Sequence, residues 1–191
     1  MAIDLKEQAT VMPSISMLGD GTAVLLRAAL PEDAARLERM FYRLSPETIY
    51  RYMFVPVPRQ PHWAERLGTL ARVDGHDHHA LVALADGEIV GIARYDRMAA
   101  PEEAEFAILI EDAWQQRGLG KLLMTRLIEE ANHHQISTFT ARILGENRRA
   151  LRLVAALFAD LQSRWDSGEC VVRSPLSRLR PLDSYGNRAA P

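Results

Sequence analysis

The stretch AEFAILIEDAWQQRGLGKLLMTRLI, residues Ala104 to Ile128, decides the fold of this chain. Its first part, Ala104–Ile110, is a short and nearly continuous apolar run, which predicts a buried strand. Leucine and isoleucine then recur at helical spacing within Gly118–His133, which predicts a helix with one apolar face. With the other elements predicted along the chain, the order is strand, helices, three strands, helix, strand, helix, strand. This order predicts an α/β sandwich around one mixed sheet.

The turn between this strand and this helix has the chemistry of an anion site. The first amides of a helix have no partners within the helix and lie at the positive end of its dipole. Glycine at positions 118 and 120 removes side chains where a phosphate must approach. The alternative is that the two glycines serve only a tight turn. We expect a pyrophosphate to be held by the amides of Gln116, Arg117, Gly118, Leu119, Gly120 and Lys121, with added positive charge from the arginine and the lysine.

Single residues exclude two other phosphate-binding motifs. A dinucleotide-binding fingerprint needs a third glycine further along the helix, where Leu123 stands. A P-loop needs a hydroxyl directly after its lysine, and Lys121 is followed by Leu122. The turn therefore predicts a phosphate site of a different kind from these two.

The rest of the chain gives further strand and helix signals. Apolar or alternating runs bounded by turn residues predict strands at 22–28, 79–85, 88–96, 136–143 and 170–173. Asp86-Gly87, between two of these runs, predicts a tight hairpin turn. Helical spacing of apolar residues predicts helices at 31–44, 45–53, 63–71 and 147–158, with a proline-rich loop at 55–61.

Length, charge and cysteine content limit the class of protein. The 191 residues suit one domain with a proper core, and we expect a leader at 1–20, the domain at 21–176 and a C-terminal tail at 177–191. A net charge of −2 argues against a nucleic-acid partner. The chain has no apolar run of about 18 residues, so we expect no membrane span. One cysteine, Cys170, excludes an internal disulfide and fits a cytoplasmic location.

Two groups of polar residues are interpreted as structural. The histidines at 76, 78 and 79 resemble a solvated loop before a strand, and those at 133 and 134 suit the negative end of a helix dipole. We therefore expect no metal site. The arginines at 148, 149 and 152 are interpreted as a solvated helix face, with contact to an adenosine 3′-phosphate as the functional alternative.

The motif Gln115-Gln116-Arg117-Gly118-Leu119-Gly120 closely resembles the Q/R-x-x-G-x-G/A acyl-CoA motif of the GNAT acyltransferase superfamily. The resemblance covers roughly residues 22–175 and continues in order through Val24–Phe54, Ala80–Tyr95, Ala104–Ile128 and Gly145–Phe158. These segments look like the GNAT domain of bacterial protein-lysine acetyltransferases. The resemblance implies a twisted, mostly antiparallel mixed sheet, with one splayed pair of strands and flanking helices.

Acetyl-CoA is the co-substrate that the resemblance implies. In GNAT folds the strand that matches 108–110 carries a bulge and splays from the next strand, and the pantetheine arm pairs with its backbone. The matching cofactor-binding positions here are Ile108, Leu109 and Ile110, and Gln115 opens the acyl-CoA motif. Asn147 matches a position that often contacts the arm, although asparagine is also a favoured helix N-cap.

The resemblance implies direct attack of an amine on the thioester in a ternary complex. An amine of the lysine type has a pKa of ~10.4, so it arrives protonated and needs a base. Glu105 stands where the resembling acetyltransferases carry their catalytic glutamate; the alternative is an exposed glutamate at the open end of a strand. Val154 stands where many members carry a tyrosine that protonates the leaving thiolate, so the thiolate is expected to leave unassisted or through water.

A protein lysine is the acceptor that the resemblance implies, and a homodimer is compatible with it. A small amine, such as a polyamine, an amino acid or an antibiotic, is the alternative acceptor. Because Val154 removes one proton donor, a non-catalytic acyl-CoA sensor is a third interpretation. Ala156-Leu157-Phe158-Ala159 lacks the glycine that is usual in the family, which should alter the end of that helix.

Overall fold

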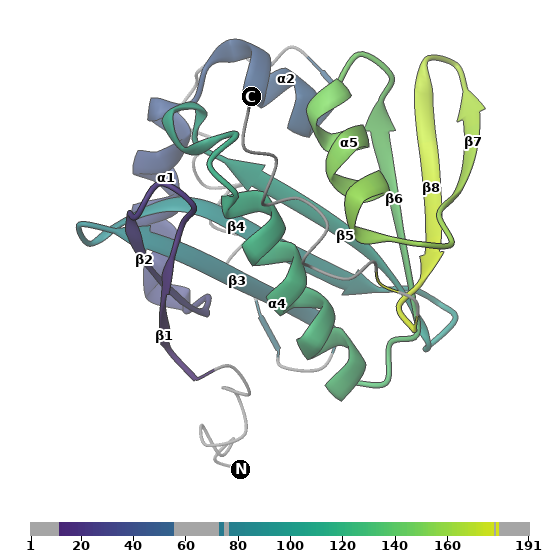
Figure 1. The fold of residues 1–191 in the computed structure, drawn as a ribbon, viewed down its shortest axis with the longest axis horizontal. Coiled ribbons are helices and arrows are strands. Elements are labelled where there is room, and N and C mark those ends of the chain that lie inside the picture. Colours follow the sequence, from purple (N-terminus) through teal and green to yellow (C-terminus); the bar gives the residue numbers. More distant parts are fainter. Residues whose placement is uncertain (1–11, 56–72, 75–76, 178, 180–191) are drawn as a thin grey trace, which may run out of the picture.

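The computed structural model describes residues 12–55, 73, 74, 77–177 and 179, which form one eight-stranded sheet with helices on both faces (Figure 1). Every neighbouring pair of strands is antiparallel except β5 and β6, which are parallel. This confirms the mixed, mostly antiparallel sheet that the resemblance implies. In order across the sheet the strands are β1 (Ser14–Met17), β2 (Ala23–Ala28), β3 (His78–Ala85), β4 (Glu88–Arg97), β5 (Glu103–Ile110), β6 (Thr138–Leu144), β8 (Glu169–Pro175) and β7 (Gln162–Asp166).

The sheet separates two hydrophobic clusters, one on each face. One buried cluster joins the sheet to α4 and α5, through residues such as Leu123 and Val154. The other joins the opposite face to α1 and α2, through residues such as Phe41 and Ile49. In the described residues no helix is both long and apolar enough to cross a membrane. The helices are α1 (Ala34–Arg43), α2 (Pro46–Met53), α4 (Leu119–His133) and α5 (Arg148–Leu157).

Local signals account for most of these boundaries. The Oγ of Ser45 accepts a hydrogen bond of 3.1 Å from the amide of Thr48, so it caps α2 directly before Pro46. Asp86 and Gly87 both have positive φ, of 49° and 79°, as the predicted hairpin between β3 and β4 requires. The predicted helix at 63–71 and the loop at 56–61 lie outside the described residues.

Two edge strands escaped prediction. Ser14–Met17, which the sequence analysis placed in the leader, pairs with β2. It exposes Ile15 and Met17 rather than burying them, so its apolar residues give no core signal. Every residue of β7 is exposed, and this strand is held through its pairing with β8. The turn between them, Ser167-Gly168 with φ of 49° and 87°, is a hairpin signal that could have identified β7.

The splayed pair of strands is β5 and β6. Their pairing covers only Glu103–Glu105 and Thr138–Thr140, after which the described residues of the two strands part. The implied bulge on β5 is not found in its pairing with β4, where residues 91–97 and 104–110 stay in one unbroken register. A register shift lies one strand away instead, between β3 and β4 at Ala83/Leu84. The splay therefore arises because β6 leaves β5, and not from a bulge between β4 and β5.

The end of α5 differs from a glycine-terminated helix. Its last residue is Leu157, and Phe158 follows in extended conformation with φ of −102°. The amide of Phe158 still donates to the carbonyl oxygen of Val154, at 3.0 Å, and its ring is buried. A buried aromatic residue in extended conformation thus ends the helix where the family usually has a left-handed glycine.

Candidate active site

A cavity of about 770 Å³ opens where β5 and β6 part. Its walls come from α2, β5, the turn after β5, β6 and α5. Phe106, which lines the cavity, packs against Phe139 with ring centroids 5.4 Å apart in the core shared with α4 and α5. The residues of the predicted cofactor site that line the cavity are Ile108, Leu109, Ile110, Gln115, Gln116, Gly118, Gly120, Lys121 and Asn147.

The two glycines of the turn have different roles. Gly118 is the N-cap of α4 with φ of 89°, a backbone conformation that residues other than glycine rarely adopt. Gly120 is set by space, because a Cβ there would lie 3.1 Å from Cδ1 of Ile110 and 3.3 Å from Cδ2 of Leu153. No acidic residue lies in the first turn of α4, so the positive end of its dipole is not neutralised there. The turn therefore keeps the positive potential that an anion site requires.

Gln115 links three walls of the cavity. Its Nε2 donates to the carbonyl oxygen of Ile110 at 3.1 Å and to Oγ1 of Thr48 at 3.2 Å. Its Oε1 accepts a hydrogen bond of 2.6 Å from Nη1 of Arg149. The amide side chain thus joins the end of β5 to both α2 and α5. Neither Thr48 nor this role of Arg149 was predicted, because sequence spacing does not show which helices meet at the turn.

Asp112 fastens α2 to the same turn. Its carboxylate accepts from the amide and hydroxyl of Ser45, at 2.8 and 2.7 Å, and from the hydroxyl of Thr48 at 2.8 Å. Burial acts to raise the pKa of Asp112, but the hydrogen bonds from Ser45 and Thr48 outweigh it and hold the pKa below its ordinary value. The carboxylate stays ionised and keeps the N-terminus of α2 beside the cavity.

Three predicted site residues within the described part of the chain lie outside the cavity lining. Leu119 is fully buried in the core. Nε of Arg117 lies 2.6 Å from Oδ2 of Asp20, and its guanidinium lies 4.4 Å from the centre of the Trp114 ring. The hydrogen bond from Arg117, with another from Thr22, lowers the pKa of Asp20 to about 2. The charge of Arg117 is therefore paired with Asp20 and does not line the cavity. In α4 and α5, the cationic residues that do line it are Lys121, Arg149 and Arg152.

Glu105 is the third of these residues, and it lies on β5 beside the mouth of the cavity. Its side chain is 51% exposed, and its Oε1 lies 3.9 Å from Nε of Arg142, which does line the cavity. The register places Asp96 of β4 opposite Glu105 on one side and Thr140 of β6 on the other. The predicted alternation holds, because Phe106 is buried against α4 and α5 while Glu105 is exposed. A carboxylate in this place can exchange protons with water and with a molecule at the cavity mouth.

Asn147 and Val154 lie on the α5 wall. Oδ1 of Asn147 accepts a hydrogen bond of 3.1 Å from the amide of Ala150, so the alternative interpretation of Asn147 as an N-cap is confirmed. Val154 is buried and lines the cavity without a titratable group. Tyr52 of α2 also lines the cavity, and burial raises the pKa of its hydroxyl. The spacing of apolar residues predicts α2 as a helix but does not show which of its side chains face the cavity.

Comparisons with known proteins agree with this geometry. The acetyltransferase (GNAT) family matches residues 37–158. Acetyltransferase PA5475 of Pseudomonas aeruginosa is 32% identical over 167 residues, 85% of this chain and 89% of that protein. Acetyltransferase Pat of Mycolicibacterium smegmatis is 34% identical over 154 residues, 79% of this chain and 45% of that protein, so the chain spans less than half of it. The crystal structure of the GNAT domain of S. lividans PAT matches with a TM-score of 0.77 and 26% identity, over 85% of this chain and 96% of that one.

Proposed function

This chain belongs to the acetyltransferase (GNAT) family, and on that premise we propose that it transfers the acetyl group of acetyl-CoA to the side-chain amine of a protein lysine. The observation that carries the proposal is the cavity between β5 and β6, whose lining includes both the glycine turn and Arg142 beside Glu105. One cavity thus offers an anion site and an acid–base group at its mouth. The resemblance of segments such as Val24–Phe54 to the GNAT domain of bacterial protein-lysine acetyltransferases supports a lysine as the acceptor.

The residues of the cavity fit the chemistry of coenzyme A. The first amides of α4, from Gln116 to Lys121, suit its diphosphate. The backbone of Ile108–Ile110 suits the amides of the pantetheine arm, because β6 pairs with β5 only as far as Glu105 in the described residues. Gly120 keeps open a space that a Cβ would fill. Acetyl-CoA supplies the thioester from which the acetyl group is transferred.

Glu105 is the proposed general base. A lysine ammonium with a pKa of ~10.4 must lose a proton before its nitrogen can form the new bond to carbon. The exposed carboxylate of Glu105 accepts this proton directly or through one water molecule. Nε of Arg142, which lines the cavity, lies 3.9 Å from Oε1 of this carboxylate. The nitrogen–carbon bond forms as the carbon–sulfur bond breaks. The first proton of the ammonium passes to the carboxylate, and the second, released as the amide forms, passes to solvent.

The leaving sulfur has no tyrosine at the family position to protonate it. Val154 holds that place, within the cavity wall. Because a thiol has a pKa of ~8.5, the thiolate is stable enough to leave without a directly positioned acid and then takes a proton from water. The non-catalytic sensor is therefore not required by the absence of this tyrosine.

The surface beside Glu105 suits a chain-borne amine. The side chains of Glu105 and Arg142 are 51% and 63% exposed, so a lysine on a larger molecule can reach them. Asp96, opposite Glu105 on β4, is paired with Arg94 at 2.6 Å, so Glu105 is the carboxylate that we assign to the acceptor. A small amine, the alternative acceptor, would use the same carboxylate, and turnover measurements decide between the two acceptors.

The experiment measures release of free thiol from acetyl-CoA with a panel of acceptors. The panel contains lysine peptides, folded proteins, polyamines, amino acids and aminoglycosides. Glu105→Gln should lower kcat about 100-fold or more, with little change in the affinity for acetyl-CoA measured by calorimetry. Glu102→Gln, which removes an equally exposed charge three residues earlier, should leave kcat unchanged.

The outcomes separate the interpretations. Turnover confined to lysine side chains supports the proposal. Faster turnover of a small amine would show that a small amine, and not a protein lysine, is the acceptor. Tight binding of acetyl-CoA with no turnover on any acceptor would identify a sensor. If Glu105→Gln and Glu102→Gln have the same kcat as the unaltered chain, Glu105 is not the base.

A further inference from the structure

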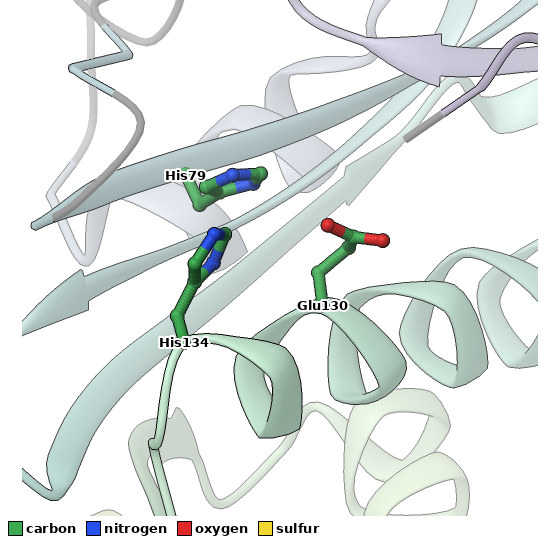
Figure 2. Close-up of side chains that lie close together, drawn as sticks. All are labelled: His79, Glu130 and His134. Atoms are coloured by element: carbon green, nitrogen blue, oxygen red, sulfur yellow. The ribbon is translucent and has the colours of Figure 1, made fainter. Parts of the chain in front are cut away.

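Three side chains outside the cavity converge at the C-terminal end of α4. His79 comes from β3, and Glu130 and His134 come from α4 and its C-cap. Their potential ligand atoms all lie within 4.8 Å of one another. Figure 2 shows the two imidazole rings and the carboxylate turned toward one another. Both histidines were predicted to be structural, because residues so far apart in the sequence give no sign that they meet.

Two buried polar atoms of this cluster have no partner within the described chain. They are Nδ1 of His79 and Oε2 of Glu130, on residues only 3% and 7% exposed. A buried polar atom without a partner is unfavourable, so native proteins leave few of them. Both atoms are therefore suited to a ligand that accepts electron pairs.

Tyr95 of β4 positions both histidine rings. Its hydroxyl lies 2.8 Å from Nδ1 of His134, and its ring stacks on that of His79 with centroids 5.5 Å apart and planes 13° apart. Tyr95 is fully buried and lies opposite His79 in the sheet register. The contact with Tyr95 thus orients the His134 ring within the cluster. A hydrogen bond to the second nitrogen of a metal-binding histidine is the usual way in which proteins orient such ligands.

We propose that His79, Glu130 and His134 bind one divalent transition-metal ion, with zinc as the best-matched ion. Two imidazoles and one carboxylate are a ligand set that zinc accepts, with water in a fourth position. His134 is only partly buried, so the ion and the water can reach the site from solvent. A tetrahedral site needs ligand atoms about 3.4 Å apart, and rotation of the long Glu130 side chain and the terminal His134 can close the remaining gap.

The proposed ion has a structural rather than a catalytic role. α4 has 15 residues, which separates its glycine turn from this cluster by about 22 Å. The ion would join the C-terminal end of α4 to β3, with Tyr95 of β4 behind it. It would thereby fix the end of the helix whose other end carries the anion site. This inference is independent of the proposed acceptor and of Glu105.

The test uses the untagged full-length chain, freed of metal with EDTA and then freed of EDTA. Zinc is titrated in competition with a chromophoric chelator, and cobalt(II) is added separately to record its visible absorption. We expect one zinc per chain and a rise in the thermal midpoint on binding. Glu130→Gln and His134→Gln should each weaken zinc binding by about tenfold or more, and Tyr95→Phe by about tenfold. The control His133→Gln, an exposed neighbour on the same helix, should bind within about twofold of the unaltered chain.

Each outcome decides the proposal. It is supported if the cluster variants lose zinc affinity and the cobalt(II) absorption of the site while they keep the affinity of the chain for acetyl-CoA. It is overturned if the unaltered chain binds neither zinc nor cobalt(II), or if the cluster variants bind as well as His133→Gln. His134→Gln changes a partly exposed residue at a helix end, so it remains informative if a variant at a fully buried position fails to fold.

Discussion

Nε2 of Gln115 donates a hydrogen bond of 3.1 Å to the carbonyl oxygen of Ile110, the last residue of β5. The bond spans the turn between the strand and α4 and fixes how the turn leaves the sheet. It also holds the end of the strand whose backbone is proposed to pair with the pantetheine arm. The first residue of the acyl-CoA motif thus has a structural role that its position in the motif does not reveal.

Gln115→Ala should weaken acetyl-CoA binding about tenfold and lower the free energy of unfolding by about 3 kcal/mol, since it removes the hydrogen bonds to Ile110, Thr48 and Arg149 and each contributes about 1 kcal/mol. Calorimetry and urea denaturation measure the two quantities. Gln115→Glu is the matched variant, because it keeps an acceptor for Arg149 but removes both donors. If Gln115→Glu behaves like the unaltered chain, the bond to Ile110 is unimportant.

Gly118 and Gly120 should respond differently to alanine. Gly118→Ala places a side chain at φ of 89° in open space, so it should lower the free energy of unfolding by about 1–2 kcal/mol. Gly120→Ala narrows the cavity between Ile110 and Leu153, so it should raise the Kd for acetyl-CoA about tenfold with a smaller loss of stability. Denaturation and calorimetry on both variants test the contrast, and equal effects on both quantities would contradict it.

Replacement of Arg142 should affect kcat/KM for the acceptor more than kcat/KM for acetyl-CoA. It lies 3.9 Å from Glu105 and 6.0 Å from the centre of the Phe54 ring, and it lines the cavity. Arg142→Gln should lower kcat/KM for the acceptor about fivefold to tenfold, because it removes the charge that is paired with the Glu105 carboxylate. Steady-state kinetics with each substrate varied in turn measure the effect. Arg126→Gln, an exposed arginine paired only along α4 in the described structure, is the control.

Asp33 should carry a large part of the pH dependence of stability. Its buried carboxylate receives hydrogen bonds of 2.6 and 2.8 Å from Arg27 and 2.9 Å from the amide of Leu30. Burial acts to raise the pKa of Asp33, but these bonds and the charges of Arg27 and Arg36 hold the pKa below its ordinary value. The pKa of Asp33 is thus lower in the folded chain than in the unfolded chain.

The stabilisation from this group is therefore complete above the unfolded pKa of ~3.9 and is lost as the pH falls through the lower folded pKa. Asp33→Asn leaves Arg27 without its partner and should lower the free energy of unfolding by about 3 kcal/mol at pH 7. Urea denaturation should show this difference shrinking as the pH falls below about 4. Glu38→Gln, an exposed change on α1, should show no comparable loss; a constant difference across pH would contradict the assignment.

The sequence alone determined the elements whose signals are local. The apolar run of β5, the leucine spacing of α4, the Ser45-Pro46 start of α2 and the Asp86-Gly87 hairpin each depend on residues a few positions apart. The glycine turn is likewise local, since it requires one strand, one helix and the backbone between them. For this reason most of the predicted cofactor site lines the cavity.

Tertiary structure decided every feature that joins distant segments. Asp20 engages Arg117, and β8 holds the polar strand β7 in the sheet. β6 parts from β5 after Glu105, which opens the cavity. His79 lies at the end of α4 only because β3 and α4 pack against each other in the same hydrophobic cluster. Contacts of this kind depend on which surfaces pack together, and periodicity within one segment carries no information about the segment it will meet.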